Sequence, residues 1–298
     1  MTLQDLADRG LIERDVPLGP YTTYKSGGPA RYFAMCEDMD ALALIGASGA
    51  AEEVPVLVVG RGSNLVVADR GFPGLVLRLG AGFSGIDVNE EVVSAGGAAP
   101  LARVARSAAE TGRAGLEFFV GVPGSVGGAV RQNAGCFGSE TRDRLVRATV
   151  VDLRGGATSD RDVGEFDLSY RHSNLKPTEV VVEALFETDP GDVETGLAEM
   201  KRITRWRRDN QPGGTLNAGS VFKNPVGGTA GEIIDHLGLK GLRIGEVSVS
   251  ERHANFFVAG AGATSEDIMA LVRLVKDRVF EETGTILEPE IQFVGFDE

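Results

Sequence analysis

Three segments in the second half of the chain carry residue types that bind anions and move protons in proteins. Residues 166–173, FDLSYRHS, place an arginine among aromatic side chains. Residues 217–225, NAGSVFKNP, surround a serine with small residues at the start of an expected strand. Residues 287–291, LEPEI, place Glu288 and Glu290 on one face of an expected strand, because side chains alternate with a period of two.

Each of these segments also has a plain structural interpretation. Arg171 can pair with a surface carboxylate, and Ser220 can cap a turn. The two glutamates can simply face solvent. The residue types alone leave both interpretations open.

Two glycine-rich loops in the first half of the chain have a more specific pattern. Residues 60–64 read GRGSN after an apolar run, and residues 121–135 read GVPGSVGGAVRQNAG. The first loop is not a Rossmann fingerprint, because Leu65 replaces the third glycine and the sequence continues as β structure. The second loop lacks the Gly-Lys-Ser/Thr of a Walker loop, and Pro123 stands where a nucleophile elbow needs its first glycine.

Both loops nevertheless offer runs of backbone N–H groups. Such arrays bind anions, pyrophosphate above all, without a lysine. Residues 124–130 could also open a helix, whose first turn favours a phosphate. Tight turns and close backbone packing explain either loop alone, whereas two such loops together favour a pyrophosphate site.

The composition limits the partners of the chain. With 30 basic and 43 acidic residues, the net charge of −13 argues against binding to nucleic acid or to an anionic membrane. The basic run at residues 201–208 is either the solvated face of a helix or a phosphate contact. Two cysteines make no disulfide framework, three histidines show no metal-ligand spacing, and no signal core or membrane-length apolar run occurs. We expect a cytoplasmic protein with no metal and no obligate protein partner.

The apolar pattern predicts a mixture of helices and strands. Strands are expected at residues 31–36, 54–59, 65–68, 75–79, 91–95, 145–153, 179–187, 220–223, 254–259 and 286–294. Helices are expected near the N-terminus and at residues 40–51, 99–111, 193–208, 229–237 and 264–283, the last ending before Gly284. The long polar helix at 193–208 predicts a domain boundary near residues 190–210.

Seven motifs, in order from about Val16 to Phe296, resemble those of the UDP-N-acetylenolpyruvoylglucosamine reductase family, the MurB family of bacterial cell-wall synthesis. They read PLGPYTTYKSGGPA, VVGRGSNLVVADRGFPGLVL, GLEFFVGVPGSVGGAVRQNAG, FDLSYRHS, NAGSVFKNP, GLKGLRIGEVSVSERHANFFV and LEPEIQFVG. No single motif is decisive, but seven in order are highly specific. The chain looks like the shorter of the family's two subtypes.

The resemblance implies an α+β fold. An FAD-binding unit of the vanillyl-alcohol-oxidase (PCMH) type, in two subdomains, is expected at residues 15–190, and a C-terminal α+β substrate-binding domain at 191–298. The link to FAD is expected to be non-covalent, because no histidine precedes His172. The FAD contacts implied by the resemblance are Arg61, Gly62, Ser63, Asn64, Gly121, Val122, Pro123, Gly124, Ser125, Gly127, Gly128 and Ala129.

The implied reaction reduces UDP-N-acetylglucosamine enolpyruvate to UDP-N-acetylmuramate, with NADPH as co-substrate. Carried over by motif, Arg171 would bind the substrate carboxylate, and a protonated Glu290 would polarise the same group. Ser220 would donate a proton to the substrate carbon. The implied contacts to the UDP-sugar are Tyr170, Lys223 and Arg208.

One departure from the family concerns the phosphate contacts. The family often has a lysine just before the Gln-Pro that precedes the serine motif, whereas Asp209 and Asn210 precede Gln211 here. The basic run ending at Arg208 is the expected substitute. Two alternatives stay open on the sequence: another FAD-dependent oxidoreductase of the same fold, and a non-catalytic homologue that binds sugar nucleotides.

Overall fold

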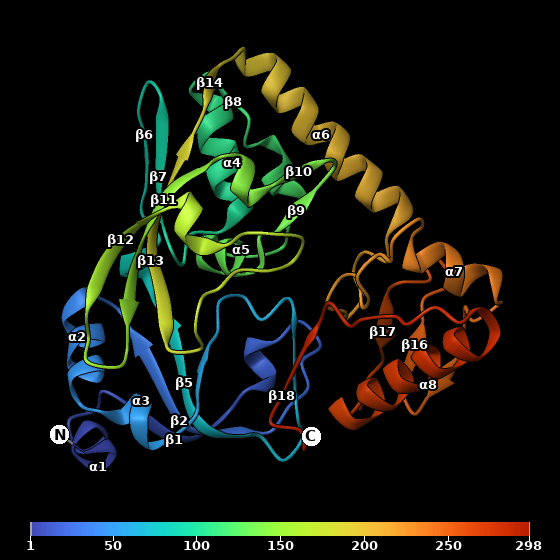
Figure 1. Cartoon of the computed structure of the whole chain (residues 1–298), viewed down its shortest axis with the longest axis horizontal. Helices are drawn as coiled ribbons and strands as arrows, with labels where there is room; N and C mark the ends of the chain where they lie inside the picture. Colours follow the sequence, from blue (N-terminus) through green and yellow to red (C-terminus); the bar gives the residue numbers. More distant parts are fainter. Residues whose placement is uncertain (1, 298) are drawn as a thin grey trace. The chain divides into compact units, whose positions relative to one another are not determined.

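The computed structural model describes residues 2–297, and the chain forms two compact units built from interleaved segments (Figure 1). Unit 1 comprises the chain up to Asp15, Arg31–Arg61 and Pro73–Trp206. Unit 2 comprises Val16–Ala30, Gly62–Phe72 and the chain from Arg207 onward. Because two early segments belong with the C-terminal third, the units are not continuous along the chain. The expected limits 15–190 and 191–298 stay a prediction.

Two β-sheets form the framework of unit 1. The first has the strand order β1 (Glu13–Pro17), β2 (Pro29–Cys36), β5 (Phe72–Leu79) and β3 (Val56–Val58), with β3 and β5 parallel. The second has the order β12 (Thr158–Asp162), β11 (Leu145–Asp152), β13 (Glu179–Glu187), β7 (Val92–Gly96) and β6 (Ile86–Val88). Its neighbouring strands are antiparallel.

Each sheet of unit 1 has its own apolar core. The helices α4 (Leu101–Glu110) and α5 (Val126–Gln132) pack on the five-stranded sheet. The helices α1 (Leu3–Asp8), α2 (Met39–Ala47) and α3 (Ala50–Glu53) contribute to a second core with the four-stranded sheet. Leu101, Val104, Ala105 and Ala108 of α4 are buried on one face of this helix. Unit 1 therefore has two apolar cores.

Short elements complete unit 1. β8 (Arg113–Ala114) pairs antiparallel with the distant β14 (Asp189–Pro190), and β9 (Gly135–Cys136) forms a small hairpin with β10 (Ser139–Glu140). Four 3-10 helices are η2 (Ala81–Phe83), η3 (Glu117–Gly121), η4 (Thr141–Asp143) and η5 (Val163–Phe166).

The long helix predicted at 193–208 is α6 (Val193–Asn210). Within residues 2–297, no helix is both long and apolar enough to span a bilayer.

Unit 2 is built around one long helix. Its antiparallel sheet has the order β15 (Arg243–Ile244), β16 (Val247–Val249) and β17 (Phe257–Ala259), and β18 (Gln292–Val294) pairs in parallel with β4 (Leu65–Val67). The other elements are η1 (Gly19–Tyr21), α7 (Ala230–His236) and α8 (Ser265–Thr283). The apolar residues on one face of α8 are all buried in the core, namely Ile268, Leu271, Val272, Val275 and Val279.

The ends of α8 follow the predicted capping pattern. Thr264 is the N-cap, and its Oγ1 accepts the amide of Asp267 at 3.0 Å. Asp69 adds a second cap, because its carboxylate accepts the amide of Ser265 at 3.0 Å. Gly284 ends the helix with φ of 71°, a left-handed conformation that glycine adopts readily.

Three predicted strands are wrong in extent. The strand predicted at 254–259 is confirmed only over β17, which begins at Phe257. Residues 220–223 form only isolated bridges, from Ser220 to Phe256 and from Phe222 to Pro289. The last strand begins at Gln292 rather than at residue 286, so Glu288 and Glu290 do not share a strand face. The cause is local, because Pro289 has no N–H to donate to a ladder.

The N-cap of α8 gives a direct stability test. We expect Thr264→Ala to lower the free energy of unfolding by about 1 kcal/mol, because the Asp267 amide loses its acceptor. Chemical denaturation of the purified protein measures this loss. Thr285→Ala, just beyond the other end of the helix, is the control, and an equal loss there would contradict the capping role.

Candidate active site

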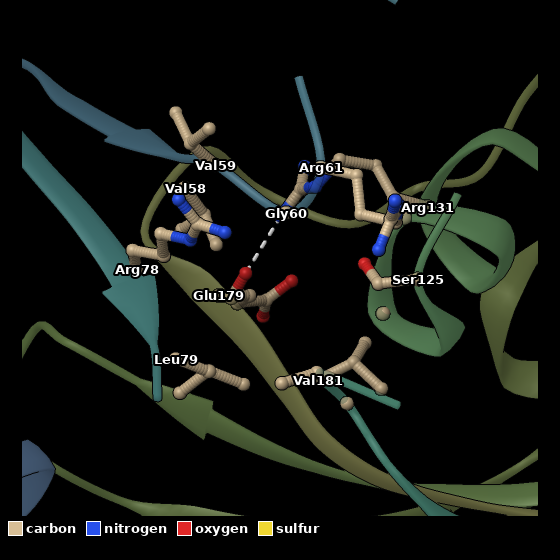
Figure 2. Close-up of a pocket in the computed structure, with 14 residues that line it drawn as sticks. Val58, Val59, Gly60, Arg61, Arg78, Leu79, Ser125, Arg131, Glu179 and Val181 are labelled. Atoms are coloured by element: carbon tan, nitrogen blue, oxygen red, sulfur yellow. Dashed lines mark hydrogen bonds between the residues drawn. The ribbon is translucent and has the colours of Figure 1, made fainter. Parts of the chain in front are cut away.

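A pocket of about 640 Å³, part of it open to solvent, lies within unit 1 (Figure 2). It is lined by β3 and the loop after it, by β5, by the loop after β7, and by residues of α5 and β13. The lining residues are Val58, Val59, Gly60, Arg61, Arg78, Leu79, Gly97, Ala98, Ser125, Gly127, Gly128, Arg131, Glu179 and Val181.

The two glycine-rich loops meet at this pocket. Four of the expected FAD contacts line it, namely Arg61, Ser125, Gly127 and Gly128. A Cβ at Gly60 would collide with Ser125 Oγ, and one at Gly127 would lie 3.2 Å from the carbonyl oxygens of Gly97 and Val181. Gly60 thus leaves room for the side chain of Ser125, and Gly127 lets its own backbone lie close to two carbonyl oxygens.

The pocket is positive although the chain is acidic. Arg61, Arg78 and Arg131 line it, against one carboxylate, that of Glu179 (Figure 2). Three guanidinium groups around glycine-rich backbone suit a ligand with phosphate groups. A local cluster of this kind operates independently of the net charge of −13.

Arg131, on α5, is fixed by three backbone carbonyls. Its Nη1 donates to Leu175 O at 3.3 Å, and its Nη2 donates to Lys176 O at 3.1 Å and to Glu179 O at 2.6 Å. Burial lowers the pKa of Arg131 from its usual value, and the charge of nearby Glu179 offsets part of that effect. An arginine remains charged under these conditions, so the pocket wall holds a cation in a defined place.

The carboxylate of Glu179 bonds to two groups that do not line the pocket, the Arg161 guanidinium and the Lys176 amide. Its Oε1 lies 2.7 Å from Nη2 of Arg161, and its Oε2 accepts the amide of Lys176 at 2.8 Å. Burial alone would raise the pKa of Glu179, but the Arg161 ion pair and the Lys176 amide outweigh burial and hold the pKa below its usual range. The carboxylate is therefore ionised and neutralised by its own partner.

The other expected FAD contacts lie elsewhere. Gly62, Ser63 and Asn64 belong to unit 2, and Gly121, Val122, Pro123, Gly124 and Ala129 are not part of the pocket lining. Gly121 has a packing reason of its own, since a Cβ there would lie 2.5 Å from Cys136 Sγ and 3.2 Å from Ile203. The roles of these eight residues stay predictions.

Asn64 makes a contact that the sequence did not predict. Its Nδ2 donates to Glu290 O at 3.0 Å, and its own carbonyl accepts the amide of Gln292 at 2.9 Å. All three residues belong to unit 2. The glycine-rich loop around Asn64 therefore supports the backbone that carries Glu290.

Arg171 lies at the corner of a tight turn in unit 1. Ser169 and His172 exchange backbone hydrogen bonds of 3.2 and 3.1 Å, so Tyr170 and Arg171 form the tip. Arg171 has φ of 55°, a left-handed conformation that is uncommon for a residue with a side chain. Its guanidinium lies 4.9 Å from the centre of the Tyr170 ring, and its Nη2 donates to Gly135 O at 3.1 Å.

The segments that carry Ser220 and Glu290 lie side by side in unit 2. The amide of Glu290 donates to Val221 O at 2.7 Å, and the amide of Lys223 donates to Glu288 O at 2.9 Å. Both Ser220 and Glu290 are half-buried. The structure therefore brings these two expected catalytic residues into neighbouring segments, whereas Arg171 belongs to unit 1.

The expected contacts to the UDP-sugar are partly or largely exposed. Tyr170 is exposed at its turn. Lys223 Nζ lies 3.4 Å from Glu288 Oε2, and Arg208 Nε lies 3.0 Å from Asp209 Oδ1. Exposed ion pairs of this kind contribute little to folding stability. Replacing the carboxylate of Glu288 or Asp209 by a phosphate therefore costs little free energy.

The sequence reasoning missed several residues of this site. Arg78, Arg131 and Glu179 line the pocket, and Arg131 lies inside the glycine-rich motif, four residues after Gly127. Because residues four apart lie on the same face of a helix, the spacing from Gly127 to Arg131 could have identified Arg131 as a pocket residue from the sequence. Asn255 was also missed: its Oδ1 accepts the amide of Phe222 at 2.9 Å, and its Nδ2 donates to Phe222 O at 2.8 Å, which fixes the backbone after Ser220.

Comparison with known proteins identifies both halves of the chain. Residues 30–159 match the family described as FAD binding domain, and residues 211–294 match UDP-N-acetylenolpyruvoylglucosamine reductase, C-terminal domain. The chain is 43% identical over 287 residues to the UDP-N-acetylenolpyruvoylglucosamine reductase of Parvibaculum lavamentivorans, covering 96% of this chain and 92% of that protein.

Solved structures agree with this match. The crystal structure of UDP-N-acetylenolpyruvylglucosamine reductase from Thermus caldophilus is similar with a TM-score of 0.83 at 36% identity, covering 95% of this chain and 98% of that one. The 6-hydroxy-D-nicotine oxidase of Arthrobacter nicotinovorans is similar in fold alone, with a TM-score of 0.54 at 12% identity, covering 97% and 86%. The expected α+β fold with a PCMH-type FAD-binding unit is confirmed.

A glycine that lines the pocket and one outside it provide a test of the close approach. Gly127→Ala is expected to weaken FAD binding about tenfold or more, because its Cβ would press on two fixed carbonyl oxygens and displace the loop. Gly164→Ala, in η5, is the control, since its Cβ would meet no other atom within 4 Å and the residue is not part of the pocket lining. Flavin titration of the FAD-depleted protein measures both affinities. Similar losses in the two variants would contradict the steric explanation.

Proposed function

The chain belongs to the UDP-N-acetylenolpyruvoylglucosamine reductase family, and from that premise we propose which of its residues carry the steps of the reaction. It is an FAD-dependent oxidoreductase that uses NADPH to reduce the enolpyruvyl group of UDP-N-acetylglucosamine enolpyruvate in peptidoglycan synthesis. The observation that carries this conclusion is the 43% identity over 96% of the chain, with both domains of the family matched in order.

The pocket of unit 1 fits the phosphate-bearing part of FAD. When bound, FAD relays two electrons from NADPH to the methylene carbon of the substrate. We assign Arg61, Arg131 and the backbone from Ser125 to Gly128 to the cofactor, because they combine positive charge with glycine-dependent close approach. Gly97 serves this arrangement indirectly, since a Cβ there would collide with Val181 O.

Arg171 is the proposed partner of the substrate carboxylate. Negative charge grows on that group as its neighbouring carbon accepts electrons, so a cation held in advance stabilises the transition state. The turn and the bond to Gly135 O restrict where the guanidinium can lie. Its planar fork matches the two oxygens of a carboxylate.

Ser220 and Glu290 are the proposed proton donor and carboxylate-polarising group. Support comes from their placement in neighbouring segments, joined by the bond from Glu290 N to Val221 O at 2.7 Å. Glu290 would act as a hydrogen-bond donor and must therefore carry a proton in the complex. A serine hydroxyl is a weak acid, so its proton moves only to a carbon that has gained negative charge.

The remaining assignments concern the nucleotide and the cell. Lys223 and Arg208 are proposed to bind the diphosphate by exchanging the carboxylates of Glu288 and Asp209 for phosphate oxygens, with Tyr170 as a further contact. A cytoplasmic location is proposed as well. Neither Cys36 nor Cys136 forms a disulfide, which suits a reducing compartment.

The function as a whole is tested by flavin absorbance. NADPH is expected to bleach the flavin band of the purified protein, and the enolpyruvyl sugar nucleotide is expected to restore it under exclusion of oxygen. Recovery without that substrate, or with oxygen alone at a comparable rate, would favour an oxidase instead.

Ser220→Ala separates the two half-reactions. We expect flavin reduction by NADPH to stay near its normal rate and reoxidation by the substrate to slow about 10²- to 10⁴-fold, because only the second step needs the proton. Stopped-flow absorbance measures each rate. Ser248→Ala, on β16 of the same unit, is the control. Equal losses in both half-reactions would sink the assignment of Ser220.

Arg171→Ala is expected to act on the same half-reaction. Loss of a charged hydrogen bond of about 1.5–3 kcal/mol predicts that reoxidation by the substrate slows about ten- to a hundredfold. Arg154→Ala, at an exposed position, is the control. Unchanged turnover in Arg171→Ala would rule out a carboxylate contact by this residue.

A further inference from the structure

The C-terminal end of α5 is bonded to the turn that carries Arg171. Asn133 ends this helix and is completely buried, with φ of 41° in the left-handed region. Its Nδ2 donates to the carbonyl of Ser169 at 2.9 Å. Ser169 is the first residue of the turn, so this bond holds the turn at the point where it begins.

Every polar atom of the Asn133 amide has a partner. Besides Ser169, Nδ2 donates to Glu140 Oε2 at 2.8 Å, and Oδ1 accepts the amide of Arg142 at 2.9 Å. A buried amide whose two donor hydrogens and acceptor are all engaged cannot rotate without losing several bonds at once. The group is therefore a fixed anchor rather than a mobile contact.

Further bonds link the same two parts of unit 1. Arg171 Nη2 donates to Gly135 O at 3.1 Å, and Ser173 Oγ donates to Arg131 O at 2.7 Å. The turn is thus bonded to the segment 131–135 before, at and after Arg171. Asn133, the residue directly after α5, is the member of this set that is completely buried and that contacts the turn through its own side chain.

The opposite end of α5 lines the cofactor pocket through Ser125, Gly127 and Gly128. A helix of seven residues is about 10 Å long, and its backbone bonds make it a rigid spacer. The cofactor loop and the anchor of the Arg171 turn are therefore two ends of one element within unit 1.

We propose that Asn133 is a positioning residue for Arg171: it holds the turn 169–172 at a fixed place relative to the cofactor loop, so that the guanidinium is set for the substrate carboxylate. This inference rests on the proposed role of Arg171. It assigns Asn133 an effect on the substrate half-reaction, and it gives Asn133 no contact with the substrate itself.

The backbone at this position dictates which variants are informative. Alanine would be strained at φ of 41°, whereas glycine adopts this conformation freely. Asn133→Gly therefore removes the three side-chain bonds and keeps the helix end. Asn133→Asp keeps the shape and loses both donors, and it places a carboxylate beside Glu140. The two variants disturb folding differently but should affect the turn alike.

The experiment compares half-reactions in Asn133→Gly, Arg171→Ala and the double variant. We expect reduction of the flavin by NADPH to stay within about twofold of normal in all three. Reoxidation by the enolpyruvyl sugar nucleotide should slow about tenfold in Asn133→Gly, and Asn133→Gly should add less than about twofold in the Arg171→Ala background. Asn133→Asp should reproduce the tenfold loss.

The control is Asn174→Ala, which removes an amide that also donates to a backbone carbonyl, that of Glu165, in the same loop. It should leave both half-reactions unchanged. Equal losses in both half-reactions, or losses that simply multiply in the double variant, would overturn the positioning role. If Arg171→Ala itself has normal turnover, the proposed carboxylate contact fails instead, and the two failures are distinguished.

Discussion

The close approach of Gly60 to the Ser125 hydroxyl, and of Gly97 and Gly127 to backbone carbonyls, is the constraint on which the pocket of unit 1 depends. A side chain at any of these positions would press on Ser125 Oγ or on a carbonyl oxygen of Gly97 or Val181. Because both sheets contribute to the pocket, a displacement of one loop would move the lining of the whole site. The glycines therefore contribute to the pocket by having no side chain, and the arginines contribute its positive charge.

Positive charge in this pocket is held by backbone oxygens. The guanidinium of Arg131 is bonded to three carbonyls, and the nearby carboxylate of Glu179 is committed to Arg161. Carbonyl dipoles stabilise a cation without neutralising it, so the charge of Arg131 still acts on a bound phosphate. An acidic chain can thus hold an anionic cofactor without a cluster of lysines.

Periodic segments could be predicted from sequence, and segments held by tertiary contacts could not. α4 and α8 each have an apolar helical face, α8 also has cap residues, and β13 is a nearly continuous apolar run, and the structure confirms all three. Ser220 and Glu290 lie in irregular backbone, because Pro289 cannot join a ladder and Asn255 supplies bonds that a strand would otherwise make. Residue identity indicated the chemistry there, but only the fold shows that the two segments are neighbours.

The glycines of the motif around α5 do not account for the whole motif, because its last part holds a buried asparagine, Asn133. Sequence reasoning treated it as a phosphate loop, which explains Gly127 and Gly128 but not the polar end at Asn133. A buried asparagine with left-handed backbone is retained only where its bonds repay burial of a polar amide. Those bonds reach Ser169, beside Arg171. One short helix therefore joins the pocket proposed for the cofactor to the turn that carries Arg171, the cation proposed for the substrate carboxylate.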